Sequence, residues 1–242
     1  HVGFGRMLVP SESLRSELIA EGFAPRDLDL VPLALPPEVE RRAFEVEPPT
    51  RAPEQPLVVA CTSSHWEGKG VHVLLDAAAL AVERGADLEL VLVGDGDADY
   101  RARLAAQASR DVLAGRVRFT GRVQQRDLGR VFEHAHVFAF PSIWPEPFGR
   151  ASLEAMAFGL ALVASDAGGI PEQFVDGESG VKVPADDAPA LAEALLALER
   201  DERRRMALAT AGRARVDARY RSARFLDALE TRIEAAIVGS AA

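Results

Sequence analysis

The sequence contains little cysteine and little lysine, and each scarcity is informative. Its one cysteine, Cys61, excludes a disulfide within the chain and favours a reducing compartment, so we expect a cytoplasmic protein. Lys69 and Lys182 are the two lysines among 28 Lys and Arg residues. A lysine in a chain that otherwise uses arginine suggests a position that needs a compact ammonium group.

A basic surface and a long apolar run are also missing. The formal net charge of −9 excludes a typical nucleic-acid partner, because such proteins neutralise phosphates with clustered Lys and Arg. No apolar run reaches the ~18 residues that a membrane span requires, so we expect no transmembrane segment; peripheral contact with the inner membrane face stays open. The chain begins at His1 without Met, and we expect a fragment boundary there.

Short apolar runs alternate with amphipathic stretches from Leu57 onward. Six runs are typical of strands, at residues 57–60, 88–93, 117–120, 137–140, 161–164 and 180–183. Five stretches show helical spacing of apolar residues, at residues 71–84, 100–110, 125–134, 151–158 and 187–198. The alternation predicts βαβ units, and therefore an α/β fold with a doubly wound, parallel, six-stranded Rossmann-like sheet covered by helices on both faces.

The two ends of the sequence do not follow this alternation. We expect short strands at residues 6–9 and 28–31 around a helix at 13–21, with Ser11 as its N-cap. Seven prolines between Pro32 and Pro56 predict a long non-helical connector. We therefore divide the chain into a remnant of a preceding domain (1–36), a Pro-rich linker (37–56), the sheet domain (57–220) and a C-terminal helix (221–242).

The loop after the first predicted strand has the parts of a phosphate site. Glycines flank Lys69, hydroxyl residues including Ser64 precede it, and a helix follows directly. Free backbone N–H groups, the positive end of a helix and an ammonium group all suit an anion. A polar loop with an exposed lysine explains this stretch equally well, so both interpretations stay open here.

The most informative stretch is residues 140–157, where a Pro-rich loop follows a strand and Gly149 begins a helix. The start of that helix favours an anion. Glu146 in the loop and Glu154 in the helix would repel an anion, but their carboxylates can accept hydrogen bonds from sugar hydroxyls. The pattern therefore predicts a ligand with central phosphates and a sugar at each end. The alternative is that Glu154 is only a favourable acid near a helix start and Glu146 a loop charge.

Three glycine-containing turns carry weaker signals. Residues 94–96 fail as a dinucleotide fingerprint, because Asp99 occupies the third glycine position, and they predict a tight turn at Gly94. Gly168 and Gly169 precede a short helix and predict either a second backbone clamp on phosphate or sugar, or an ordinary turn. Residues 176–180 predict a simple turn.

In order and spacing these motifs resemble family 4 of the glycosyltransferases, enzymes of the GT-B fold. The resemblance runs from about Val9 to the C-terminus and is strongest at residues 141–183. There Glu146-Pro-Phe-Gly, Glu154, Gly168-Gly-Ile-Pro-Glu and Asp176-Gly-Glu-Ser-Gly-Val follow one another. The resemblance implies that the chain is the C-terminal, donor-binding domain with a remnant of the N-terminal acceptor domain, on which the helix near 222–238 would pack.

The same resemblance implies a retaining transferase whose substrate is a nucleotide-diphosphate sugar and which requires no metal and no cofactor. It assigns the catalytic position to Glu146, at the hydroxyls of the donor sugar. It implies that Glu154 holds the ribose, that Lys69 holds the diphosphate, and that the loop after Gly121 borders the nucleobase. The further substrate-binding residues that we expect are Ser64, Gly94, Arg122, Val123, Phe148, Gly149 and Arg150.

Two departures from the family pattern leave alternatives open. Many relatives carry a phosphate-binding Arg in the first loop, where this chain has Cys61-Thr62-Ser63-Ser64. The acceptor domain is mostly missing, so the acceptor (a glycan, a lipid or a small molecule) is not identified, and we expect this chain alone to transfer no sugar. The alternatives are a non-catalytic nucleotide-sugar-binding or scaffold module, and a related enzyme such as a sugar-nucleotide epimerase or a phosphorylase.

Overall fold

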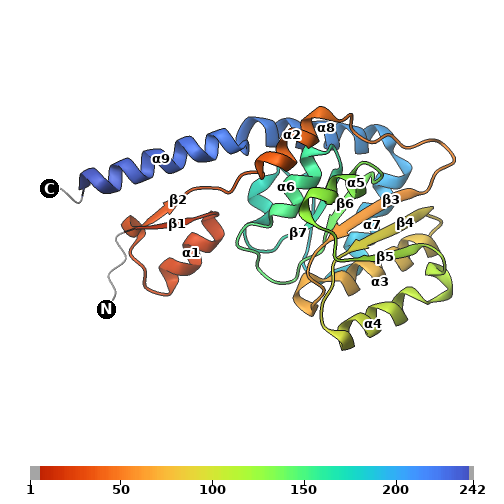
Figure 1. The fold of residues 1–242 in the computed structure, drawn as a ribbon. Coiled ribbons are helices and arrows are strands. Elements are labelled where there is room, and N and C mark those ends of the chain that lie inside the picture. Colours follow the sequence, from red (N-terminus) through yellow and green to blue (C-terminus); the bar gives the residue numbers. More distant parts are fainter. Residues whose placement is uncertain (1–5, 240–242) are drawn as a thin grey trace.

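A computed structural model describes residues 6–239, which form a large α/β domain and a smaller two-stranded unit beside it (Figure 1). All neighbouring strands of the large sheet are parallel. These strands are β3 (Leu57–Thr62), β4 (Leu88–Val93), β5 (Val117–Gly121), β6 (Val137–Phe140), β7 (Ala161–Ser165) and β8 (Val181–Val183). The predicted fold class, a doubly wound, six-stranded Rossmann-like sheet, is confirmed.

The strand order is β5-β4-β3-β6-β7-β8. The chain therefore runs from β3 at the centre to one edge, returns to β6 at the centre, and runs to the other edge. In open α/β sheets a ligand binds at this point of reversal, beyond the carboxyl ends of the two central strands. The topology thus directs attention to the loops that follow β3 and β6.

Two apolar clusters lie on the two faces of the sheet. Successive side chains of a strand point to opposite faces, so Leu57 and Val59 join one cluster and Ala60 joins the other. The first cluster is covered by α3 (Val71–Glu83), α4 (Ala98–Ala108) and α7 (Ala188–Arg200), and the second by α2 (Pro37–Glu45), α5 (Leu128–Phe132) and α6 (Arg150–Ala157). The long helix α8 (Glu202–Arg219) contributes Leu208 to the first cluster and Val216 to the second.

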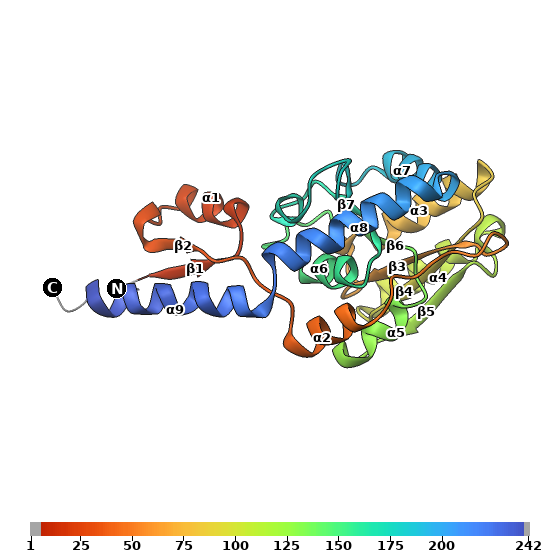
Figure 2. The ribbon, with the colours of Figure 1, turned by 90° about the horizontal axis from the view of Figure 1, so that it is seen from above.

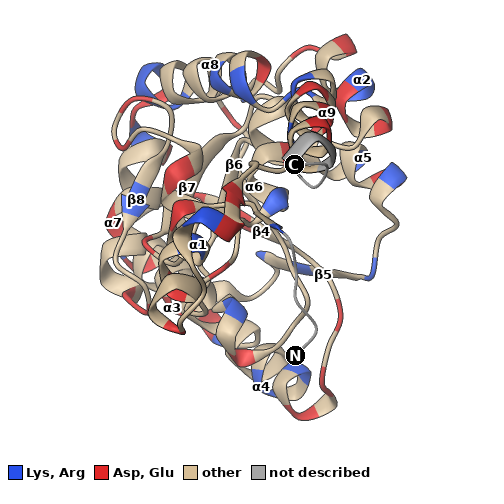
Figure 3. Cartoon of the chain, turned by 90° about the vertical axis from the view of Figure 1, so that its left-hand side faces the viewer, with Lys and Arg blue, Asp and Glu red and all other residues tan. Residues whose placement is uncertain are grey.

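Two arginines of α8 donate hydrogen bonds to other parts of the protein. Figure 3 shows basic residues along this helix, with acidic residues among them. Arg213 donates hydrogen bonds to the carbonyl oxygens of Ala43 and Val46 at 3.0 and 3.1 Å. Arg215 donates to the carbonyl oxygen of Gln173 at 2.7 Å. Helix α8 thereby holds both α2 and the loop after β7 in place.

The smaller unit consists of the parallel strands β1 (Met7–Val9) and β2 (Leu28–Leu30), connected through α1 (Glu12–Ala20) and the 3₁₀ turn η1 (Pro25–Asp27). Ser11 caps α1, as predicted, by accepting a hydrogen bond from the backbone N–H of Leu14. Helix α9 (Ser222–Gly239) runs beside this unit (Figure 2), and Arg232 approaches Asp29 to 3.7 Å. That the unit is a remnant of another domain stays a prediction. Within residues 6–239, no helix combines the length and apolar character needed to span a membrane.

The prediction of a non-helical linker is wrong for residues 37–45, which form α2. Pro36 is the N-cap of this helix and Pro37 is its first residue, a position where proline costs nothing because the first N–H groups of a helix have no intrahelical partner. Val39 and Ala43 are buried on one side of α2 and anchor it to the second cluster.

The predicted helix at 125–134 is also shorter than expected. Residues Gln125–Asp127 form the 3₁₀ turn η4, and only Leu128–Phe132 are α-helical, since the following residues already turn into β6 and His136 donates its N–H to the carbonyl oxygen of Val58. The C-terminal helix expected at 221–242 begins at Ser222, and the end predicted for it lies outside the described residues. The other expected elements begin and end within two residues of their predicted bounds.

Candidate functional site

The loops after β3 and β6 are hydrogen-bonded to each other. We call residues 66–70 the Lys69 corner and residues 141–149 the Glu146 loop. The carbonyl oxygen of Gly68 accepts hydrogen bonds from the backbone N–H groups of Ile143 and Trp144, both at 2.8 Å. The structure therefore brings together the loops that carry Lys69 and Glu146.

Gly70 makes this approach possible. It has φ +64°, and a Cβ at this position would overlap the carbonyl oxygen of Pro141. Only glycine combines this left-handed backbone with such a close approach. The contact between the two loops therefore depends on the absence of a side chain at residue 70.

We expect Gly70→Ala to lower the free energy of unfolding by about 2 kcal/mol more than the control Gly115→Ala. Gly115 also has a positive φ, +75°, but a Cβ there would meet no atom within 4 Å, so the control measures backbone strain alone. Denaturant titration of both variants gives the comparison. Equal losses would show that the two loops do not touch in solution.

Lys69 and Glu146 form an ion pair between the two corners. Lys69 ends the 3₁₀ turn η2 (Glu67–Lys69), and its Nζ contacts Oε1 of Glu146. Side-chain exposure is 20% for Lys69 and 9% for Glu146. The Ser142 hydroxyl lies 2.9 Å from the same carboxylate oxygen. The sequence assigned Lys69 to phosphate and Glu146 to sugar separately, whereas the structure makes them one unit.

A buried glutamine that the sequence did not single out fixes the start of α6. Gln173, in the 3₁₀ turn η5 (Ile170–Gln173), is fully buried. Its amide nitrogen donates to the carbonyl oxygens of Phe148 and, at 3.2 Å, Gly149, and its amide oxygen accepts from Ser152 at 2.6 Å. Gly149 is the N-cap of α6, with φ +80°. The sequence carries no local signal for it, since Gln173 directly follows another polar residue, Glu172.

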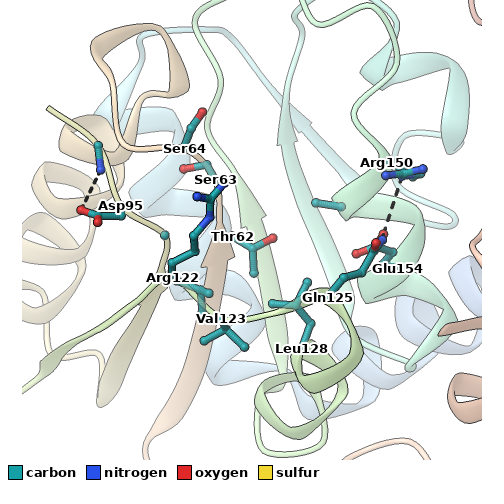
Figure 4. A pocket seen from close by; sticks show the side chains of 14 residues that line it. Thr62, Ser63, Ser64, Asp95, Arg122, Val123, Gln125, Leu128, Arg150 and Glu154 are labelled. Carbon is teal, nitrogen blue, oxygen red and sulfur yellow. Dashed lines mark hydrogen bonds and ion pairs between the residues drawn. The ribbon is translucent and has the colours of Figure 1, made fainter. Parts of the chain in front are cut away.

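A cavity of about 740 Å³ opens at the carboxyl ends of the central strands (Figure 4). Its walls are formed by residues that follow β3, β4 and β5, together with the first turns of α6. Six of the ten predicted site residues line it, namely Ser64, Gly94, Arg122, Val123, Arg150 and Glu154. The other four, Lys69, Glu146, Phe148 and Gly149, belong to the two corners and do not line this cavity.

Glu154 lies at one end of the cavity, and Figure 4 shows it beside Gln125 and Arg150. Gln125 donates a hydrogen bond to Oε1 of Glu154 at 2.9 Å, and Nε of Arg150 lies 3.8 Å from the same oxygen. Burial raises the pKa of the Glu154 carboxyl, although Gln125 and Arg150 act in the opposite direction. The sequence missed Gln125, whose signal was its place directly after the predicted nucleobase loop.

Arg122, Ser63, Ser64 and Asp95 lie at the other end of the cavity (Figure 4). The carboxylate of Asp95 forms an ion pair with Arg101 at 2.9 Å. Within residues 6–239, no carboxylate forms an ion pair with Arg122, and its side chain is exposed to the cavity. At the predicted tight turn beside it, after the end of β4, Gly96 instead forms an isolated parallel bridge with His65.

Gly169, the second residue of the glycine pair at 168–169, allows the smaller unit to approach the Glu146 loop. A Cβ on Gly169 would lie 2.6 Å from the Cβ of Ser11, whose hydroxyl donates to the carbonyl oxygen of Pro147 at 2.6 Å. The carboxylate of Glu172 accepts from the N–H groups of Glu12 and Ser13 at 2.9 and 2.8 Å. The sequence predicted either a backbone clamp or an ordinary turn at this glycine pair, and neither prediction included a contact with the smaller unit.

No group of three or more His, Cys, Asp or Glu side chains in the described part of the chain is arranged to hold a metal ion. That the reaction requires no metal and no cofactor stays a prediction.

Comparison with protein families gives one match over most of the chain. The model of the family "Glycosyl transferases group 1" matches residues 44–215. Phosphatidyl-myo-inositol mannosyltransferase of Mycobacterium tuberculosis is 40% identical over 152 residues, which are 61% of this chain and 39% of that protein. The chain thus spans about two fifths of the length of this relative.

A longer match is to the amylovoran biosynthesis glycosyltransferase AmsK of Erwinia amylovora, 30% identical over 88% of this chain and 52% of that protein. A GDP-mannose-dependent alpha-(1-6)-phosphatidylinositol monomannoside mannosyltransferase of Mycolicibacterium smegmatis is 34% identical over 74% of this chain and 50% of that protein. Among solved structures, Anabaena HepE in complex with UDP-glucose has a TM-score of 0.80 at 24% identity, covering 95% of this chain and 64% of that one.

Proposed function

Because the chain belongs to the group 1 glycosyl transferases, we propose that it is the donor-binding half of a retaining glycosyltransferase that uses a nucleotide-diphosphate sugar. The observation that carries this proposal is the cavity at the point of strand reversal. A buried carboxylate, Glu154, lies at one end of it, and at the other lies Arg122, which has no ionic partner within residues 6–239. The Lys69–Glu146 pair lies on the adjoining corners. Such a site offers separate partners for ribose, phosphates and sugar.

The donor is held by three kinds of contact. Glu154 accepts hydrogen bonds from the ribose hydroxyls, and Glu146 accepts from hydroxyls of the donor sugar. The ammonium of Lys69 pairs with the carboxylate of Glu146 and has further N–H donors for the departing phosphate. The first turn of α6 places additional N–H groups at the phosphate.

Sugar transfer then requires no separate protein base. The bond from the anomeric carbon to the phosphate oxygen breaks, and its electron pair stays on that oxygen. The acceptor hydroxyl forms the new bond on the same face of the sugar, and its proton passes to the departing phosphate oxygen. Lys69 stabilises the negative charge that develops there.

Arg122 takes the place of the arginine that the first loop lacks. It comes from the end of β5 and points toward Ser63 and Ser64 (Figure 4). It has no ionic partner among the residues of the structure, so its charge is available for a phosphate. Its role is therefore phosphate binding, with the nucleobase beside Val123.

We assign GDP-mannose as the donor, because two relatives that are 33% and 34% identical are named GDP-mannose-dependent mannosyltransferases. The acceptor-binding half belongs to the complete protein, since the matched residues cover only 39% and 50% of two relatives. A sugar nucleotide of this kind is consistent with the cytoplasmic location that the single cysteine suggests.

Calorimetric titration with GDP, UDP and ADP tests the proposal. We expect GDP to bind most tightly, and Arg122→Ala to weaken GDP binding about tenfold or more while guanosine binding changes little. Ser64→Arg in the Arg122→Ala background restores the charge from the first loop and should recover most of the loss. If none of the three nucleotides binds at millimolar concentration, the chain is a non-catalytic module that kept only the fold.

A further inference from the structure

Both tryptophans of the sequence lie exposed at the corners of the proposed donor site. Trp66 lies in the Lys69 corner and Trp144 in the Glu146 loop, and they are 40% and 51% exposed. Their ring centroids are 5.8 Å apart and their planes are inclined at 62°. The two rings form one aromatic surface, although the loops that carry them are far apart in the sequence.

This aromatic surface is held in place by the backbone. A Cβ at Gly68 would overlap the indole ring of Trp66, so that ring lies directly against the glycine. The carbonyl oxygen of the same glycine accepts the backbone N–H of Trp144 at 2.8 Å. A surface that is already ordered loses little conformational entropy when a ligand binds.

A second cavity, of about 420 Å³, adjoins Trp66; we call it the Trp66 cavity. Its lining combines aromatic, acidic and basic side chains, namely Trp66, Glu67, Asp97, Asp99, Tyr100 and Arg103. Arg103 pairs with Glu67 at 2.8 Å and lies over the Tyr100 ring at 4.9 Å. A cavity of this size is typical of small-molecule sites, and it is separate from the cavity that contains Glu154.

The chemistry of this lining suits a neutral sugar. The C–H groups of a pyranose face carry partial positive charge and pack on the negative face of an aromatic ring. Its hydroxyls donate to carboxylates and accept from guanidinium groups. Three carboxylates beside one arginine disfavour a phosphate, and they also disfavour an anionic membrane surface.

The aromatic surface is joined to the reacting centre by one side chain. The Ser142 hydroxyl lies 3.1 Å from the carbonyl oxygens of Gly68 and Trp144 and 2.9 Å from Oε1 of Glu146. We propose that Trp66, Trp144 and the Trp66 cavity form a carbohydrate subsite that holds a sugar ring of the acceptor. The role as acceptor subsite rests on the proposed glycosyl transfer, whereas the binding of sugar does not.

The two indole N–H groups provide a direct test, because the sequence contains no other tryptophan. We would titrate the 242-residue chain, labelled with ¹⁵N, with mannobiose, mannotriose and maltotriose, and follow both indole signals. We expect at least one saccharide to shift both signals saturably. Trp66→Ala should weaken that binding about tenfold, and Asp99→Asn should weaken it several-fold without removing an aromatic ring. Phe23→Ala removes an exposed aromatic ring of the smaller unit and should change nothing.

Three outcomes would separate the possibilities. If no saccharide shifts the indole signals, there is no carbohydrate subsite. If vesicles containing phosphatidylglycerol broaden these signals while saccharides do not, the surface contacts membrane and the proposal is overturned. If saccharides bind while GDP and UDP do not, the subsite stands and the proposed donor site fails.

Discussion

Replacing Glu154 by glutamine should stabilise the free protein at neutral pH and weaken its binding of nucleoside diphosphates by about 10- to 100-fold. The carboxylate is buried at the end of the main cavity, where burial raises its pKa. A neutral amide of the same shape avoids the cost of burying the charge and can still accept the hydrogen bond from Gln125. It gives the ribose a weaker acceptor, because hydrogen bonds to a charged group are stronger.

The stability difference should depend on pH in a defined direction. Because the pKa of Glu154 is raised in the folded state, the folded protein holds a proton that the unfolded chain has already released. The wild type therefore loses stability as pH rises from the ordinary pKa of glutamate through the raised value. Thermal melts should show Glu154→Gln and wild type alike in acid and the variant more stable at neutral pH.

Glu178→Gln is the control for this experiment, since Glu178 is exposed and its replacement should alter neither melting nor nucleotide binding. A Glu154→Gln variant that binds GDP as tightly as the wild type would remove the ribose contact from the proposed site.

Replacing Lys69 by alanine should destabilise the protein by about 3 kcal/mol, because it leaves the Glu146 carboxylate buried without a cation. Lys69→Ala combined with Glu146→Gln should recover most of this loss, since the second change removes the uncompensated charge. Urea titration of the wild type, both single variants and the double variant gives the coupling energy. Both single variants should also abolish sugar transfer by the complete protein.

The other lysine supplies a matched control. Lys182 pairs with Asp166 at 2.9 Å, but both side chains are more than a third exposed, so Lys182→Ala should cost only about 0–1 kcal/mol. If the effects of Lys69→Ala and Glu146→Gln simply add, the ion pair does not form in solution and the two corners act independently.

Most of the fold was predictable because the strands and most helices of the large domain have their own local patterns. Apolar runs that alternate with helical patterns identify β3 to β8. A glycine or an aspartate N-cap marks the start of most helices between and after these strands. Helix α2 escaped prediction because its proline-rich stretch is typical of a non-helical connector, although Pro37 occupies a position that helices tolerate. Its helical state depends on Val39 and Ala43 packing against residues that lie far along the chain.

The sequence predicted which residues belong to the site, but it did not predict which of them contact one another. Motif spacing indicated Lys69, Glu146 and Glu154, and the parallel sheet brought their loops to one edge. That Lys69 contacts Glu146, 77 residues away, depends on loop conformations that no local pattern records. The same holds for Glu172, which binds the start of α1, and for Gln173 beneath α6.

Cys61 lies on β3 inside the first apolar cluster, and burial raises the pKa of its thiol to about 12. Hardly any thiolate exists at neutral pH, and reagents have no path to the sulfur while the sheet is intact. The rate at which this thiol is alkylated therefore reports how often the central strands open. A cysteine introduced on the surface, in contrast, would react readily. A single spin label or fluorophore can therefore be attached to such a cysteine without first replacing Cys61.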